Sequence, residues 1–491
     1  MNTAKLCTFL IAAVLAALSS GCLLGPNYQA PSMEVPADWR WKTAEPKDHV
    51  PRGDWWRVFN DTNLNRLEEL AETANQDLRA ATARVEQSRA TARFRNGDFF
   101  PALTGGVDLV RYRTSGTRPS PVGFPIPSFT QEQWNVPFDL SYEVDLWGKV
   151  RRSFESVRNQ AFAAEAARHS ILLSLQADIA ANYFSLQSVE RQIRLLQDAI
   201  QLRNEALSVF QQRLQAGLGS EFEVQRARVE VASATADLAE VKQRRAALEN
   251  AVAVLCGRPP SSFEIQVGAG SAPVPLIAAD VPSSLLERRP DVAEAERLMV
   301  ARNAEIGVAK TAFFPSLRLT GSGGLQSGEL TELFQWESRT WSMGPSLTFP
   351  IFAGGKGSAN VRRAQAAYEE AVAVYRQRVL VAFRDVEDNL AALRFLSEEA
   401  QARTSAAEAA VAAAGLAFER YRAGAVNFLE VVDAESARLR SETSRILVGQ
   451  QQLAATVRLI KALGGGWDEP AAATNTTTTT TTTVHVPVSG N

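Results

Sequence analysis

The sequence has few of the residues that build metal sites and disulfide frameworks. Its 491 residues include three cysteines and three scattered histidines, His49, His169 and His485. No histidine has a cysteine or a second histidine near it in the chain, which argues against a zinc site. Cys7 falls in an apparent export signal, so the exported chain would keep only Cys22 and Cys256. We therefore expect neither a disulfide framework nor a bound metal.

Sequence signatures of enzymes and of nucleic-acid binding are also missing. No Gly-rich phosphate loop lies between a strand and a helix, and there is no nucleophile elbow. Gly105-Gly106 and Gly323-Gly324 fit strand or turn positions instead. The formal net charge of −2 gives no reason to expect nucleic acid as a partner. A non-enzyme without a cofactor is expected.

The first 21 residues have the features of a signal peptide. Lys5 supplies the positive end, an apolar run covers 9–18, and small residues precede Cys22. The run is too short to span a bilayer. Ending at Gly-Cys, the segment resembles a lipoprotein signal, in which Cys22 would carry lipid. Leu18 stands four residues before Cys22, where the lipoprotein pattern prefers three, and the alternative is an ordinary signal followed by an incidental cysteine.

The chain contains an internal duplication. Three landmarks recur: Phe99-Phe100-Pro101 as Phe313-Phe314-Pro315, Gly148-Lys149 as Gly355-Lys356, and Arg213 to Gly217 as Arg420 to Gly424. The last two pairs share an offset of 207 residues (148 to 355 and 213 to 420), so the stretch between them has one length in both copies. A two-fold repeat is therefore the organising feature of the chain.

The repeat suggests six segments. They are a signal peptide (1–21), an N-terminal lipidated arm rich in proline (22–62), a first copy (63–257), a linker (258–288), a second copy (289–466) and a Thr-rich tail (467–491) that we expect to be disordered.

Each copy predicts helices of unusual length. Residues 148–213 and 355–420 lack proline and are rich in Ala, Leu, Gln, Glu and Arg. At 1.5 Å per residue such helices are roughly 100 Å long. Gly-bearing turns then lead into returning helices at about 221–255 and 428–463, and a further helix is predicted from Asn63 toward Arg95.

Between the helices lie segments of alternating polarity. From Trp134 to Asp145 every even position is apolar and every odd position is polar or proline, and 341–351 repeats this alternation. Period two predicts a strand with one apolar face. Weaker partners at 103–112 and 317–325 complete two hairpins, hence four strands per chain.

Four strands cannot close a barrel alone, and an open sheet edge is not tolerated in lipid. Three copies would supply twelve strands, an even number within the range of outer-membrane barrels. Two copies would supply eight strands, and side chains fill the interior of a barrel of that size, which leaves no passage. We therefore expect an α+β membrane protein with a trimeric 12-stranded β-barrel. The even-numbered residues of 134–144 would face lipid; a strand of a soluble sandwich is the alternative.

The residues also resemble a known family, the TolC-like outer membrane factors, in the NodT/OprM-like lipoprotein branch that serves efflux pumps. The resemblance covers roughly residues 22–466. Its most specific motifs are Gly25-Pro26-Asn27-Tyr28, Trp55-Trp56 with Phe59, Arg288-Arg289-Pro290-Asp291 with Ala295-Glu296, and Phe313-Phe314-Pro315.

The resemblance implies a homotrimeric exit duct for a tripartite efflux system. The barrel would lie in the outer membrane, with Cys22 adding a lipid anchor, and an α-helical barrel would cross the periplasm. The end of the helical barrel far from the membrane would close to a narrow aperture. A periplasmic adaptor joined to an inner-membrane pump would dock there. Docking would involve the two turns, residues Gly217, Leu218, Gly219 and Ser220, and residues Gly424, Ala425, Val426 and Asn427.

The resemblance also implies a gate at the periplasmic aperture. Glu430 and Asp433 match its acidic lining, and Leu429 matches an apolar gate position. Tyr421 matches a residue that ties the helical hairpin shut, with Glu223 as its acidic partner. A solvated helix face is the alternative for Glu430 and Asp433.

Two further points stay open at the level of sequence. Asp178 and Asp385, again 207 positions apart, either face the lumen or satisfy helix packing. A periplasmic coiled-coil adaptor or scaffold lipoprotein is the alternative to the duct, although such a protein would usually have a single helical hairpin.

Overall fold

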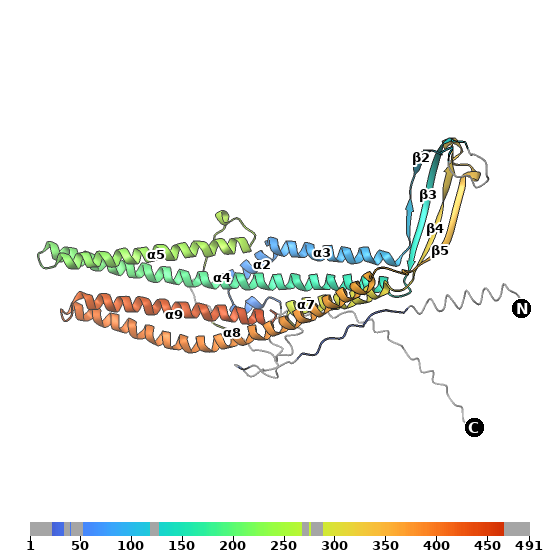
Figure 1. Ribbon diagram of the computed structural model, residues 1–491. Coiled ribbons are helices and arrows are strands. Elements are labelled where there is room, and N and C mark those ends of the chain that lie inside the picture. The colour runs from blue at the N-terminus through green and yellow to red at the C-terminus, as the bar shows by residue number, and fades with distance from the viewer. Residues whose placement is uncertain are drawn as a thin grey trace, which may run out of the picture.

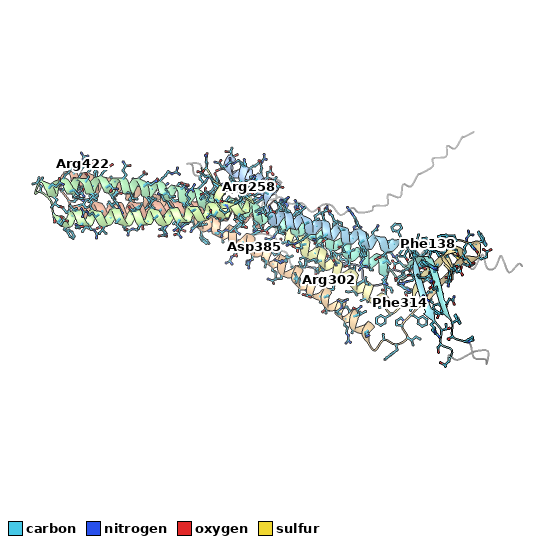
Figure 2. All side chains as sticks on the ribbon, turned by 90° about the horizontal axis from the view of Figure 1, so that it is seen from above. Phe138, Arg258, Arg302, Phe314, Asp385 and Arg422 are labelled. Atoms are coloured by element: carbon cyan, nitrogen blue, oxygen red, sulfur yellow. The ribbon has the colours of Figure 1, made fainter. Side chains whose placement is uncertain are left out.

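The computed structural model describes residues 22–33, 40, 53–117, 127–267, 274–275 and 288–465. Long helices form an elongated body, and a small sheet leaves that body at one end (Figure 1). Figure 2 labels Phe138 at the sheet end and Arg422 near the opposite tip. The predicted signal peptide, most of the linker and the Thr-rich tail lie outside the described residues.

Two helical hairpins make up most of the body. In the first copy, α4 (Lys149–Gln215) has 67 residues and α5 (Glu221–Leu255) has 35. In the second, α8 (Lys356–Arg422) and α9 (Phe428–Ala462) have the same 67 and 35. All four boundaries of the second hairpin follow those of the first by 207 residues. The equal lengths expected from the repeat are confirmed.

Glycine forms the turn of each hairpin. Gly217 and Gly424 have φ angles of 71° and 75°, in the left-handed region that glycine adopts without steric cost. In the first turn the Leu218 N–H donates to the Arg213 carbonyl at 2.8 Å, and the equivalent bond of the second turn is 2.9 Å. This pattern satisfies carbonyls that the helix end would otherwise leave free.

The strands form one antiparallel sheet. They are β1 (Ala102–Gly105), β2 (Asp108–Arg113), β3 (Thr130–Val144), β4 (Ser316–Ser327) and β5 (Arg339–Thr348). β1 and β2 both pair with β3, so they form one interrupted strand, and the order continues through β4 to β5. The five segments therefore occupy the four positions predicted, as two hairpins joined side by side.

The strand register separates polar from apolar side chains over most of the sheet. Leu140 lies opposite Gly321, which lies opposite Met343, whereas the neighbouring Asp139 lies opposite Ser322. Because successive side chains point to opposite faces, most apolar residues of the strands share one face, and Val110 and Tyr112 of β2 lie on the other. Met343 is 80% exposed on the mainly apolar face. The single apolar face predicted from period two is confirmed in the sheet.

The first copy departs from prediction in its leading helix. Instead of one helix over 63–95 there are two, α2 (Thr62–Ala74) and α3 (Gln76–Asn96). Asn75 between them has extended backbone, with ψ of 130°. Its amide donates to the Leu255 carbonyl at 2.8 Å and accepts from the Leu78 N–H at 2.9 Å. A tertiary contact with α5 thus breaks the helix, which propensity alone does not reveal.

In the second copy the corresponding helix is α7 (Pro290–Thr311). Short 3₁₀ helices complete the described structure: η1 (Trp55–Phe59), η2 (Gly97–Phe99), η3 (Pro260–Ser262), η5 (Leu330–Glu332) and η6 (Trp336–Ser338). Among the described helices none is long and apolar enough to cross a membrane.

The main core lies where the returning helices end. η1 places Trp55 and Phe59 against α4, with the Phe59 and Phe184 ring centroids 4.7 Å apart. The Trp55 indole N–H donates to Gln176 at 3.1 Å. The Trp-Trp motif thus anchors the chain leading into α2 on the middle of the body.

The returning helices end in equivalent glycines that pack tightly. Gly257 has φ of 63°, and a Cβ there would lie 2.2 Å from the Ala74 carbonyl oxygen. Gly464, 207 residues later, would meet the Arg288 carbonyl oxygen at 2.3 Å. In both copies the glycine after the returning helix therefore packs directly against the backbone of an earlier segment.

We expect Gly257→Ala to destabilise the protein by about 2–5 kcal/mol, since overpacking adds to the left-handed penalty. Gly217→Ala is the control: its φ is also positive, at 71°, but nothing lies within 4 Å, so only about 1–2 kcal/mol is expected. Urea unfolding in detergent, followed by helical circular dichroism, measures both. Equal losses would show that the contact with Ala74 contributes nothing.

Candidate functional site: the helical tip and the arm junction

Both turns lie at the end of the body farthest from the sheet (Figure 1). Ser220 begins α5 with a reciprocal capping box, in which its hydroxyl accepts from the Phe222 N–H at 3.2 Å. Asn427 begins α9 by accepting from the Glu430 N–H at 3.2 Å. The side chains of Leu218 and Phe222 are 73% and 76% exposed. The tip therefore presents capped helix starts with apolar side chains in solvent.

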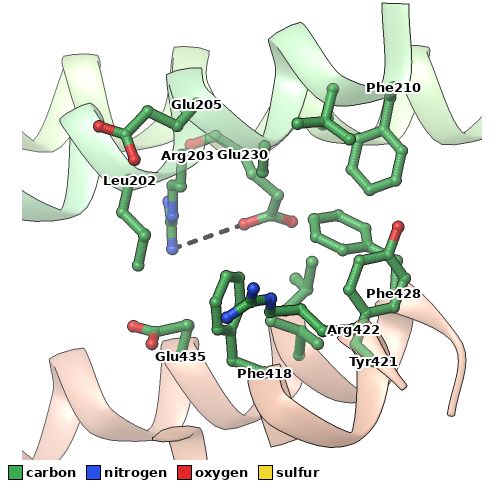
Figure 3. Close-up of a pocket in the computed structure, with 15 residues that line it drawn as sticks. Leu202, Arg203, Glu205, Phe210, Glu230, Phe418, Tyr421, Arg422, Phe428 and Glu435 are labelled. Atoms are coloured by element: carbon green, nitrogen blue, oxygen red, sulfur yellow. Dashed lines mark hydrogen bonds and ion pairs between the residues drawn. The ribbon is translucent and has the colours of Figure 1, made fainter. Parts of the chain in front are cut away.

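Aromatic rings join the two hairpins near this tip. Phe210 of α4 packs on Phe428 of α9 with centroids 4.2 Å apart, and Tyr421 of α8 lies 5.8 Å from Phe428 (Figure 3). The Tyr421 hydroxyl accepts from Arg213 Nη1 at 3.1 Å. Edge-to-face packing and one charge-assisted bond thus link the hairpins.

The predicted gate residues of α9 lie on an exposed surface. Leu429 is half exposed, and Glu430 and Asp433 are exposed one helical turn apart. A Glu430 oxygen lies 3.9 Å from Arg420 Nη1, with both side chains more than half exposed. Such a pair is weak in solvent.

Glu223 lies at the tip but not against Tyr421. Its carboxylate accepts from the Ser220 N–H at 3.1 Å, which completes the capping box. The hydroxyl of Tyr421 is bound by Arg213 instead. The sequence marks Arg213 only as part of the repeated segment 213–217. Nothing local in the sequence shows that its side chain contacts the other hairpin.

A second group of motif residues surrounds the start of the arm. Cys22 is exposed, and the Leu24 N–H donates to the Trp147 carbonyl at 3.1 Å, where β3 gives way to α4. The buried Arg152 donates to the Leu24 carbonyl at 3.2 Å and to Asn27 at 2.8 Å. These bonds hold Cys22 beside the junction of sheet and helices.

The same arm packs along α7. Gly25, with φ of 97°, crosses Gly307 so closely that a Cβ would lie 2.5 Å from the Gly307 Cα. The Pro26 carbonyl accepts from Asn303 at 3.0 Å, and the Tyr28 hydroxyl donates to Glu296 at 3.0 Å. Burial, followed by the charge of Glu296, raises the pKa of Tyr28, so its phenol remains a donor. The Gly-Pro-Asn-Tyr motif and Glu296 are therefore parts of one contact.

The Arg-Arg-Pro-Asp motif places the buried Arg289 in an ion network at mid-body. Arg289 lies 2.7 Å from Asp291 and 3.3 Å from Asp385 of α8, and it donates to the Ala462 carbonyl at 3.3 Å. Burial alone would raise the pKa of Asp291, but the hydrogen bonds and charge of Arg289 outweigh it and lower the pKa. Asp385 thus serves helix packing, whereas Asp178 lines a small surface hollow beside Asn75.

The fold and these motif contacts agree with comparisons to known proteins. The family described as Outer membrane efflux protein matches residues 67–258 and 281–465. The chain belongs to this family, whose members are outer-membrane efflux proteins and not enzymes.

Individual relatives span nearly the whole chain. Outer membrane protein OprJ of Pseudomonas aeruginosa is 34% identical over 94% of this chain and 96% of its own length. The toluene efflux pump outer membrane protein TtgF of Pseudomonas putida is 31% identical over 94% of this chain and 97% of its own length. The solved outer-membrane channel OprN has a TM-score of 0.83 at 29% identity, covering 91% of this chain and 100% of its own. The open-state MtrE channel of Neisseria gonorrhoeae has a TM-score of 0.79 at 29% identity, covering 91% of this chain and 99% of its own.

Proposed function

We propose that three copies of this chain form the outer-membrane exit duct of a tripartite efflux system. The observation that carries this proposal is the sheet. One face is mainly apolar and the other mainly polar. Within the described residues β5 and the interrupted strand β1/β2 are each paired on one side only. Lipid does not tolerate open edges. Pairing β5 of one copy with β1/β2 of the next would close twelve strands around a polar lumen.

The helices would continue the passage. Their hairpins of equal length put both turns of a protomer at one depth, so three protomers would give six turns in a ring. Substrates delivered by an inner-membrane pump through a periplasmic adaptor would then cross the periplasm inside the helices. Leu218 and Phe222, exposed at the tip, are the apolar side chains that we assign to adaptor docking, together with both turns.

Conductance in a planar lipid bilayer tests the duct. The purified protein should insert as a trimer and give discrete ion currents. A protein that remains monomeric in solution without detergent and gives no current would contradict the proposal.

We assign the aperture to Leu429, Glu430 and Asp433, with Tyr421 and Glu223 as part of the gate. Threefold symmetry would turn each carboxylate into a ring of three. The negative charges of such a ring together attract and hold divalent cations. Replacing Glu430 and Asp433 together with Ala should raise the Mg²⁺ concentration for half-block of the current by roughly tenfold or more.

Glu240→Ala is the control for this gate variant, because Glu240 is an exposed carboxylate of α5 away from the tip. It should leave block unchanged. If the double variant is blocked like the unaltered protein, Glu430 and Asp433 do not line the aperture.

We further propose that Cys22 carries the lipid anchor. Its exposure and the fixed position of Leu24 at the sheet junction would put an acyl chain level with the end of the barrel. Cells fed radioactive palmitate should label the protein, and Cys22→Ser should abolish the label. The buried Cys256 gives the matched control, Cys256→Ser, in which labelling should persist.

A further inference from the structure

A cavity of about 320 Å³ lies between the two hairpins near the tip, which is within the range of small-molecule sites, roughly 300–1,000 Å³. Its apolar wall comes from both hairpins (Figure 3). Ala206, Val209 and Phe210 of α4 face Phe418 of α8 and Phe428 and Val432 of α9.

Most of the charged groups around the cavity are already in ion pairs. Arg203 donates to the Glu230 carbonyl at 2.8 Å and lies 3.6 Å from its carboxylate, which Arg226 also approaches at 3.5 Å. Glu435 is bound by Arg438 at 2.8 Å.

Of the remaining two charged residues, Glu205 has a neutral partner and Arg422 an acidic one. Glu205 accepts from Gln201 at 3.2 Å, and Arg422 lies 3.6 Å from Glu419. An anion would therefore find the cations of the wall already paired, and a cation would meet only Glu205, whose exposed carboxylate is screened by solvent. Either would lose its hydration on entry.

We infer that this cavity binds a small, neutral aromatic molecule. Three phenylalanine rings and the ring of Tyr421 line the cavity and offer edge and face contacts, and the aliphatic side chains fill the spaces between them. Because the wall is shared by both hairpins, the bound molecule stabilises the arrangement described here over any in which the hairpins separate.

This coupling rests on the proposed function: a ligand that holds the hairpins together opposes widening of the tip and lowers the current. The binding site itself does not depend on conduction. The two parts are therefore measured separately.

Binding is tested with 4-fluorotoluene by ¹⁹F NMR, using the full chain in lipid nanodiscs and empty nanodiscs as the baseline for partitioning. The unaltered protein should give saturable binding. Ala206→Phe puts a ring into the cavity and should weaken binding at least about tenfold. Val209→Trp fills the cavity from its exposed rim, with the same expected loss. Val229→Phe, on an exposed position of the same hairpin outside the cavity, should bind normally.

Absence of saturable binding, or equal binding by Ala206→Phe, Val209→Trp and the unaltered protein, overturns the site. In bilayers, 4-fluorotoluene should reduce the current of the unaltered protein and Val229→Phe but not of Ala206→Phe. Ligand binding with no change in current overturns the coupling. If no sample conducts, the proposed duct fails, while the NMR result still decides the site.

Discussion

Replacing Leu140 with Arg is expected to remove the protein from the outer membrane. Leu140 lies near the middle of the apolar face of the sheet, opposite Gly321 and Leu103. An Arg on the lipid face near the bilayer centre costs about 2–4 kcal/mol. In the proposed trimer that cost falls on all three copies, so the amount of assembled protein should fall by far more than tenfold. Quantifying heat-resistant oligomer in outer-membrane fractions measures the loss.

Ser141→Arg is the matched control for this prediction. Ser141 is the next residue along β3 and points to the polar face, where it pairs with Thr320. An Arg there would enter a water-filled lumen, so oligomer should remain near its normal amount. If both variants accumulate equally, the apolar face does not contact lipid.

Replacing Arg289 with Met should destabilise the body by about 3 kcal/mol, because it leaves the partly buried Asp291 without its cation. Asp291 would lose its closest partner, at 2.7 Å, and the Ala462 carbonyl would lose a donor. Urea unfolding in detergent, with helical circular dichroism as the signal, measures the change.

Arg384→Met provides the comparison, since Arg384 also contacts Asp385, at 2.8 Å, but is 64% exposed. An ion pair exposed to solvent contributes little to stability, so this variant should unfold almost normally. Similar losses for Arg289→Met and Arg384→Met would mean that burial does not strengthen the network.

Periodicity and repetition carry the parts of the fold that were predictable. The 207-residue offset and the absence of proline were enough to predict the lengths of α4 and α8. The alternation of period two was enough to predict β3. The break at Asn75 was not predictable, because it depends on a carbonyl at the end of α5, 180 residues away. The interruption between β1 and β2 likewise appears only once both segments are paired with β3.

The candidate site shows a similar division. Leu429, Glu430 and Asp433 were expected near the second turn, and they do lie there on an exposed surface. The partners of Tyr421 could not be derived, because Arg213 and Phe210 belong to the other hairpin and approach only through tertiary packing. Resemblance to a family pointed to Arg289, but its role as a buried cation needed the positions of Asp385 and Ala462.

The equal lengths of the two hairpins limit how this chain can evolve. Inserting one residue into α4 alone would rotate everything beyond it by about 100° and shift it by about 1.5 Å. Phe210 would then no longer face Phe428, and the two turns would reach different depths. Descendants with a longer or shorter reach must therefore gain or lose residues in all four long helices at once, in multiples close to whole helical turns.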